Sequence, residues 1–270
     1  MIVDIINKLL EDHQSKTDVI KIWYIKEFLQ SEVLDFIYRN KDYKNLIFYG
    51  GTAMRFLLWL NRLSEDLDFI GQWFQDFESL WADIKEYFLK QKKIELDYKL
   101  QKFRITLKFR WLLDNFGLKF ENSKDLYLKI EISDHFDFCQ KHKIKNYPVL
   151  YQDKSMIIHS LDESTLFSTK LNAVLYRQRS KKNTTSQISI KWRDFYDLFR
   201  YLQKSIVPNI QCIESIDDMA TLKSKLIKII KTTDFGEVVQ DIKPFLEDDT
   251  MLGFIQNNGK DYIIEKVKGR

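Results

Sequence analysis

The sequence has few of the residues that build disulfide-rich or zinc-stabilised folds. Its 270 residues include two cysteines, Cys139 and Cys212, and four histidines, and no Cys-x-x-Cys spacing occurs. Neither a disulfide framework nor a zinc site is therefore expected. No segment approaches the ~20 consecutive apolar residues of a membrane span, and the amino terminus lacks a basic, signal-like segment. These absences argue against a membrane partner and against export, and they predict a protein of the reducing cytoplasm.

A large excess of one charge is also missing. The 43 basic and 39 acidic residues leave a net charge of only +4, so the molecule as a whole is not expected to coat nucleic acid. Any nucleic-acid contact must come from a local cluster. What the chain does have is 44% hydrophobic and 14% aromatic residues, which can fill the core of one large domain or two modest ones.

Hydrophobic periodicity divides the chain into two parts. Spacing of three and four residues predicts helices over 2–11, 18–39 and about 77–91, whereas alternation predicts strands over 94–100, 103–109 and 126–133. From Ser160 the pattern is helical, beginning with a Ser160-x-x-Glu163 capping box and continuing through helices near 209–231 and 236–247 to a frayed tail from Glu265. We predict an α+β fold, with a small mixed sheet flanked by helices in residues 1–155 and a helical domain in residues 156–270.

Residues 46–69 carry the most informative pattern. An apolar strand precedes Gly50-Gly51-Thr52, an apolar helix follows, and an extended segment then carries Asp66 and Asp68. Two adjacent glycines let a polyphosphate approach backbone N–H groups, and Thr52 serves as helix cap or phosphate donor. Two acids spaced by two in a strand share one face, where their mutual repulsion raises their pKa values unless Mg²⁺ is bound.

These residues resemble a known family. Gly50-Gly51-Thr52, thirteen intervening residues and Asp66-x-Asp68 are similar to the first motif of the polymerase β type nucleotidyltransferases. The string Arg62-x-Ser64-x-Asp66-x-Asp68-Phe69 resembles the AbiEii/AbiGii family, the toxin-type nucleotidyltransferases of bacterial abortive-infection and toxin–antitoxin systems. The alternative is a βαβ unit with a solvated acidic strand end, which leaves two acids so soon after an apolar helix unexplained.

The resemblance implies a third carboxylate on a neighbouring strand. Glu131 is the candidate, because Lys129, Glu131 and Ser133 share one face of their predicted strand. The family more often has aspartate at this place, although the longer glutamate still reaches a metal or an acceptor hydroxyl. The alternative is that Glu131 is a solvated edge partner of Lys129.

The helical half is similar to the later motifs of the same family through Lys170-Leu171-Asn172-Ala173, Arg177 and Arg193-Asp194-x-x-Asp197-Leu198. In that family the lysine contacts nucleotide phosphates and a helical aspartate completes the site. Independently, the apolar neighbours of Lys170 predict a partly buried ammonium group that needs an anion, such as a triphosphate. The alternative for Asp194 and Asp197 is that they are first-turn acids favoured by the helix dipole.

A basic cluster brackets a polar loop at 183–187 and consists of Arg177, Arg179, Lys181, Lys182, Lys191 and Arg193. These basic residues are expected to attract the phosphates of an RNA acceptor. The alternative is that they form the solvated end of a helix. Arg62 and Ser64 are expected to contact phosphate. The alternative for Arg62 is an ion pair with Glu65 or Asp66.

The resemblance therefore implies transfer of a nucleoside monophosphate from a nucleoside triphosphate to an acceptor, with Mg²⁺ or Mn²⁺ as cofactor. RNA, with tRNA as one case, is the expected acceptor, and a cognate antitoxin is the expected partner. The expected catalytic residues are Asp66, Asp68, Glu131, Lys170 and Asp194; the metal ligands Asp66, Asp68 and Glu131; and the nucleotide ligands Gly50, Gly51, Thr52, Ser64 and Lys170. The rival functions are a catalytically silent nucleotide- or partner-binding module and a small-molecule transferase of the antibiotic-adenylylating type. The base and the acceptor depend on loop contacts that have no sequence signature.

Overall fold

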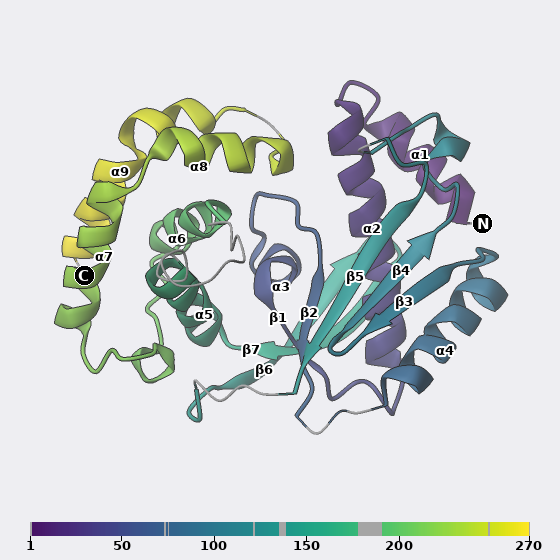
Figure 1. Cartoon of the computed structure of the whole chain (residues 1–270), viewed down its shortest axis with the longest axis horizontal. Helices are drawn as coiled ribbons and strands as arrows, with labels where there is room; N and C mark the ends of the chain where they lie inside the picture. The colour runs from purple at the N-terminus through teal and green to yellow at the C-terminus, as the bar shows by residue number, and fades with distance from the viewer. Residues whose placement is uncertain are drawn as a thin grey trace. The chain divides into compact units, whose positions relative to one another are not determined.

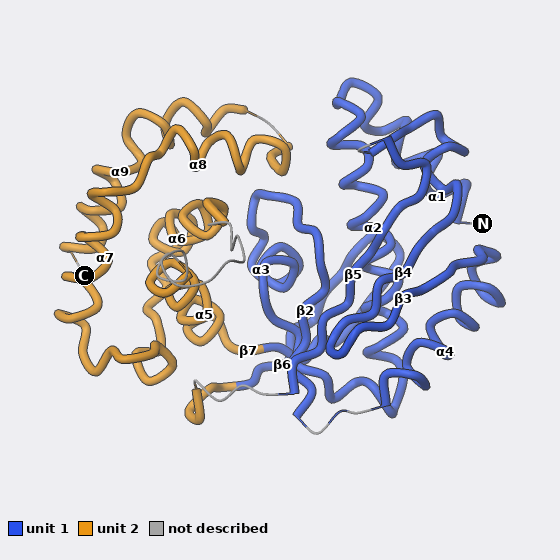
Figure 2. The backbone as a smooth tube through the Cα atoms, in the orientation of Figure 1, with its two compact units in different colours: residues 1–136, 144–160 blue, residues 137–143, 161–270 orange. Residues whose placement is uncertain are grey.

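The computed structural model describes residues 2–72, 74, 76–120, 122–134, 139–177, 191–247 and 249–269. The chain forms two compact units, which Figure 2 shows in different colours. Unit 1 comprises residues 1–136 and 144–160, and unit 2 comprises residues 137–143 and 161–270. Strand β7 runs across residue 155, where the sequence analysis divides the chain. Within the described residues, no helix is long and apolar enough to cross a membrane.

Unit 1 is built on a seven-stranded mixed sheet, so the predicted α+β fold is confirmed (Figure 1). Its helical elements are α1 Ile2–Asp12, α2 Asp18–Arg39, α3 Gly50–Leu58, α4 Phe77–Tyr87, the π-helical turn η1 Phe88–Lys92 and the 3₁₀ turn η2 Asp114–Phe116. Its strands are β1 Ile47–Tyr49, β2 Leu67–Ile70, β3 Asp97–Gln101, β4 Arg104–Phe109, β5 Leu126–Ser133, β6 Ile144–Tyr151 and β7 Lys154–Leu161.

The sheet has the strand order β3-β4-β5-β2-β1-β7-β6. Strand β2 pairs antiparallel with β1 and parallel with β5, which places the short β2 in the middle of the sheet. The apolar side chains of β4 and β5 alternate with polar ones and are buried on one face. On that face Phe88 of η1 meets Phe109 edge-on, and Trp81 of α4 stacks on Tyr98 of β3 at 3.7 Å between ring centroids. The polar side chains of the same strands lie on the opposite face of the sheet.

The hairpin of β6 and β7 was not predicted. Its strands contain Pro148 and a buried lysine, Lys154, which interrupt a simple alternation of apolar and polar residues. Lys154 is accommodated because its Nζ lies 3.0 Å from a carboxylate oxygen of Glu32 in α2, which also pairs with Lys92. The Tyr87 hydroxyl donates to Glu32 as well, and burial raises the pKa of that phenol well above its usual range. Ion pairing with a distant residue therefore allows a lysine to be buried in β7, and a local sequence pattern does not predict such a pairing.

Unit 2 is helical apart from its connection to β7. Its elements are α5 Glu163–Tyr176, α6 Arg193–Gln203, the 3₁₀ turn η4 Ile210–Cys212, α7 Met219–Thr232, α8 Phe235–Ile242, the 3₁₀ turn η5 Lys243–Phe245 and α9 Leu252–Lys268. The expected frayed tail is wrong as far as Lys268, because α9 reaches that residue with Val267 buried. The expected capping box is also wrong. Asp162 caps α5 by accepting the N–H of Thr165 at 2.9 Å, while Ser160 is a buried β7 residue whose hydroxyl donates to the carbonyl of Phe48.

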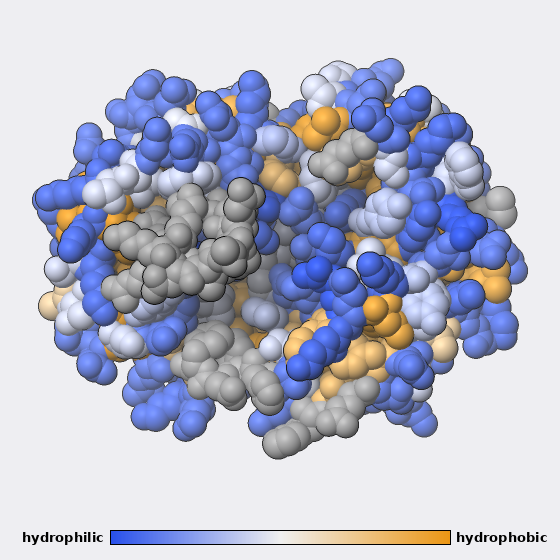
Figure 3. All heavy atoms as spheres, in the orientation of Figure 1, coloured by the Kyte–Doolittle hydropathy of each residue, from blue (hydrophilic) through white to orange (hydrophobic). Residues whose placement is uncertain are grey.

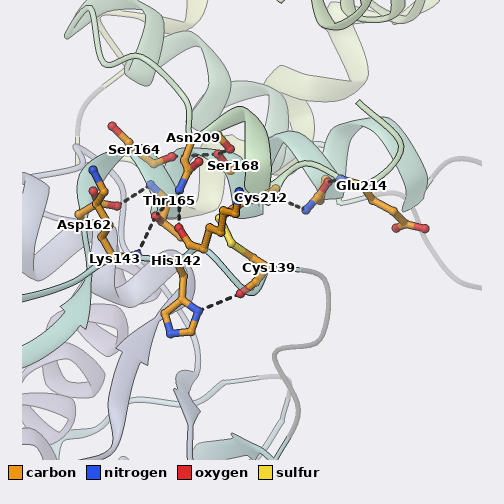
Figure 4. Close-up of a disulfide and its surroundings, with 12 residues drawn as sticks. Cys139, His142, Lys143, Asp162, Ser164, Thr165, Ser168, Asn209, Cys212 and Glu214 are labelled. Carbon is orange, nitrogen blue, oxygen red and sulfur yellow. Dashed lines mark hydrogen bonds between the residues drawn. A yellow bond between two sulfur atoms is a disulfide. The ribbon is translucent and has the colours of Figure 1, made fainter. Parts of the chain in front are cut away.

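A disulfide joins Cys139 to Cys212, with 4.5 Å between their Cα atoms, which corrects the expectation of no disulfide framework (Figure 4). Their 73-residue separation gives no local spacing signal. Folding brings them together because Asn209, just before η4, donates from its side chain to the carbonyl of Lys141 at 3.1 Å, while its N–H donates to Ser164. The short segment at 139–143 is thereby held against the start of α5 within unit 2.

Candidate active site

The turn between β1 and α3 is shaped by close contacts with the segment that returns to β2. Gly50 has φ +82, and a Cβ atom there would overlap the carboxylate of Asp68. A Cβ on Gly51 would lie 2.9 Å from both the guanidinium of Arg62 and the hydroxyl of Ser64. The Thr52 hydroxyl donates to the backbone carbonyl of Asp66. Folding therefore places the glycine pair against the Arg62 to Asp68 string.

This geometry rules out one expected role and favours one of two alternatives for another residue. Thr52 is fully buried and Tyr49 occupies the cap position of α3, so the helix-cap role of Thr52 is wrong. Arg62 is buried and donates to the carbonyl of Leu63, which favours its structural role. The helix also begins at Gly50 itself, so the first backbone N–H groups of α3 belong to Gly50, Gly51 and Thr52. Such N–H groups lack intrahelical acceptors and bind anions.

Gly50 allows a test of this close approach. Gly117 also has a left-handed backbone, with φ +67, but no atom lies within 4 Å of a Cβ built there. We expect Gly117→Ala to cost about 1–2 kcal/mol in the free energy of unfolding, from backbone strain alone. Gly50→Ala is expected to cost clearly more, because its methyl group must also displace Asp68. Urea denaturation of both variants checks this, and equal losses would mean that Asp68 does not pack on Gly50.

The acidic residues form part of a row that crosses the sheet. Tyr49 of β1 pairs in register with Asp68 of β2, Asp68 with Glu131 of β5, and Glu131 with Arg104 of β4. Residues in register on adjacent strands present their side chains to the same face. Asp68 and Glu131 are therefore neighbours, as predicted from their separate strand patterns. Asp66 directly precedes β2 and has one buried carboxylate oxygen.

Glu131 has a partner that the sequence analysis missed. Both the Nε and the Nη2 atoms of Arg104 contact the same carboxylate oxygen of Glu131, at 2.7 and 2.5 Å. Strand β5 lies inside the sheet, so the reading of Glu131 as an edge partner of Lys129 is wrong. The alternation at 104, 106 and 108 puts Arg104 on the polar face, but its partner follows only from the strand register. No group of three or more His, Cys, Asp or Glu side chains in the described part of the chain is placed to hold a metal ion.

Within unit 2, a second charged cluster gathers around Lys170. Its Nζ atom lies 2.8 Å from Asp197 and 3.2 Å from Asp194, and Arg177 donates to the other oxygen of Asp194 at 2.6 Å. The side chain of Asp197 is 0% exposed, that of Asp194 6% and that of Lys170 12%. The predicted buried ammonium is therefore present, but its anions are two carboxylates. Asp197 is an internal ion-pair partner rather than a solvated first-turn acid.

Two of the described residues of the basic cluster are engaged within unit 2. Arg193 is fixed within unit 2, because its backbone N–H donates to Asp241 at 2.9 Å and its guanidinium lies over the ring of Phe245. Arg177 is held by Asp194. Lys191 is exposed, whereas Arg179, Lys181, Lys182 and the loop at 183–187 lie outside the described residues.

Comparison with known proteins adds independent information. The family model described as nucleotidyl transferase AbiEii toxin, type IV TA system, matches residues 34–251. A search of curated proteins finds no match. Among solved structures, MenT4, a nucleotidyltransferase toxin from Mycobacterium tuberculosis H37Rv, has a TM-score of 0.59 and 13% identity over 97% of this chain and 88% of its own. JHP933 from Helicobacter pylori has a TM-score of 0.50 and 17% identity over 92% of this chain and 94% of its own.

The structural matches concern the fold, since their sequence identity is low. The family match concerns the sequence itself and spans most of the chain, including the Gly50 to Asp68 motif and the Lys170, Asp194 and Asp197 cluster. Because this family model matches well over half of the chain, the protein belongs to the AbiEii family of nucleotidyl transferase toxins.

Proposed function

We propose that this nucleotidyltransferase toxin transfers a nucleoside monophosphate from a nucleoside triphosphate to an RNA acceptor in the cytoplasm, and that a cognate antitoxin restrains it. One observation carries the proposal. The backbone of Gly50, at the N-terminus of α3, lies directly against the carboxylate of Asp68. Groups that would bind phosphate and a group that would bind a cation are thereby adjacent, as a triphosphate with its cation requires.

The residues present fit a divalent cation supplied together with the nucleotide. Mg²⁺ is commonly held by one or two carboxylates plus substrate phosphates rather than by a complete protein cage. Asp66 and Asp68 would provide these carboxylates, whereas Glu131, which is held by Arg104, is not placed to complete a group of three with them. When bound, the ion would neutralise charge that develops on the phosphoryl oxygens. The backbone N–H groups of Gly50, Gly51 and Thr52 and the hydroxyl of Ser64 would hold the phosphates.

Two further residues complete the proposed roles. Arg104 holds the Glu131 carboxylate in the same row as Asp68, where Glu131 would orient the acceptor hydroxyl. An ammonium group has three N–H donors, and the contacts of Lys170 with Asp194 and Asp197 use two of them. The third would donate to a phosphate oxygen, with Asp194 as the residue that orients Lys170.

The test is to incubate the full chain with each α-labelled triphosphate and total cellular RNA, and to follow where the label goes. We expect label in RNA with Mg²⁺ or Mn²⁺ and none with excess chelator. In parallel, triphosphate at 100 times its Kd should raise the free energy of unfolding by about 2.7 kcal/mol only when the metal is present. Label in small molecules would support the antibiotic-adenylylating alternative. Binding without transfer to any acceptor would support the silent module.

A further inference from the structure

The polar face of β3, β4 and β5 continues the row that contains Asp68 and Glu131. In the next row Thr106 of β4 pairs in register with Lys99 of β3 on one side and Lys129 of β5 on the other. Successive residues on one face of a strand are about 7 Å apart. The two lysines therefore lie about 7 Å along the strands from the row of Glu131, on the same side of the sheet.

These two lysines differ from the other basic residues of the face. Lys108 pairs with Asp125 at 2.9 Å, and Arg110 pairs with Asp97. Within the described part of the chain, Lys99 and Lys129 show no ion pair, and Lys99 is exposed while Lys129 is partly exposed. Two ammonium groups on the flanks of one threonine repel each other weakly and attract a polyanion.

Exposed aromatic residues lie on this face and in the turn that follows β4. Tyr127 is 43% exposed and Trp111, just after β4, is 57% exposed. Trp111 has φ 55, an unusual backbone for a bulky residue, and its N–H donates to Asp125 at 2.8 Å. This bond, and then Lys108, lowers the pKa of the Asp125 carboxyl group. Strained backbone that the surrounding contacts maintain is a mark of functional positions.

The charged groups and the aromatic residues follow one another in consecutive rows along the strands. Lys108 and Tyr127 are cross-strand neighbours one row beyond Lys99 and Lys129, and the ammonium group of Lys108 lies 5.9 Å from the Tyr127 ring centroid. Arg110 and Trp111 follow at the end of β4. Figure 3 shows hydrophilic residues together with a hydrophobic patch on the visible surface in the region of these strands. From Glu131 outward, cationic groups and exposed rings therefore follow one another along the sheet.

We propose that this β3–β5 face, made of Lys99, Lys108, Arg110, Trp111, Tyr127 and Lys129, binds a single-stranded segment of the RNA acceptor and directs its reacting end toward Asp68 and Glu131. The proposal rests on the proposed transferase function and names the surface that selects its acceptor. Repeated phosphates match spaced ammonium groups, and bases stack on exposed aromatic rings. An acidic protein segment would match the charges but would not need two exposed rings beside them.

The test measures binding without transfer. Full-length Asp68→Asn protein is titrated against a fluorescently labelled, mixed-sequence single-stranded RNA oligonucleotide over a series of salt concentrations. Each phosphate contact contributes about 0.7 to the slope of log affinity against log salt for single strands. We expect Lys99→Ala/Lys129→Ala to reduce that slope by about 1.4. The control Lys41→Ala/Lys44→Ala removes two exposed lysines between α2 and β1 and is expected to leave the slope unchanged.

The rings give a second, independent readout. Trp111→Ala or Tyr127→Ala should weaken binding about 5- to 150-fold at an unchanged salt slope, because stacking is not ionic. Trp111→Phe should keep most of the affinity, which separates stacking from a folding defect. The proposal is overturned if the parent does not bind RNA, if both lysine pairs change the slope equally, or if neither ring matters. This assay measures RNA binding and requires no nucleotidyl transfer. A failed transferase assay would therefore count against the proposed function without deciding whether this face binds RNA.

Discussion

Replacing Asp68 by asparagine is expected to lower the rate of nucleotidyl transfer by about 10³-fold, equivalent to about 4 kcal/mol of transition-state stabilisation, while the protein stays folded. Asp68 faces the N-terminus of α3 and shares its row with Glu131. The isosteric amide keeps the packing against Gly50 but loses the charge that would hold a cation. Asp66→Asn should behave similarly, because the contact of Thr52 is with the backbone carbonyl of Asp66 and survives the substitution.

The free energy of unfolding of these variants is as informative as their transfer rate. The carboxylate of Asp68 gains from the helix dipole, so its loss should change the free energy of unfolding by no more than about 1 kcal/mol. Asp42→Asn, which alters an exposed acid between α2 and β1, is the control and should affect neither quantity. Transfer rates and melting temperatures check both expectations. Unfolding of both Asp66→Asn and Asp68→Asn would show that these acids are structural.

The second large effect is expected from Lys170. Lys170→Met removes the ammonium group from the buried carboxylates of Asp197 and Asp194 and leaves Arg177 paired with Asp194. Removing one partner of a buried ion pair typically costs about 3–5 kcal/mol, because the remaining buried charge loses the attraction of its partner. We expect a loss of this size in the free energy of unfolding, measured by urea denaturation. Arg177→Ala should cost about 1 kcal/mol or less, because its side chain is 44% exposed.

A charge-balanced variant makes this prediction decisive. Lys170→Met/Asp197→Asn removes one charge of each sign and keeps the pair of Arg177 with Asp194. It should therefore be more stable than Lys170→Met alone, with a coupling energy of about 0.5–3 kcal/mol between the two sites. Simply additive losses would contradict an ion-pair cluster. Lys170→Arg should restore neither stability nor transfer fully, because a planar fork does not replace a compact ammonium group between two carboxylates.

Local patterns were enough for several elements. The amphipathic spacing of α1, α2 and α4 and the alternation of β3, β4 and β5 are periodicities of the backbone itself, so they are visible in a single sequence. The β6–β7 hairpin was missed because Lys154 is buried by its pairing with Glu32, a residue more than a hundred positions away. The disulfide of Cys139 and Cys212 was missed for the same kind of reason.

The sequence by itself determined the family, the helices α1, α2 and α4 and the strands β3, β4 and β5, and it provided the residue types that are proposed to carry the chemistry. These follow from short-range constraints: a glycine pair at the start of a helix, acids spaced by two where a strand begins, and a lysine among apolar neighbours. Only the tertiary structure decided the partners. The register of β4, β5 and β2 pairs Arg104 with Glu131 and aligns Glu131 with Asp68, and the packing of α5 on α6 gives Lys170 two carboxylates. Such pairings depend on contacts between distant residues, whose geometry no local pattern encodes.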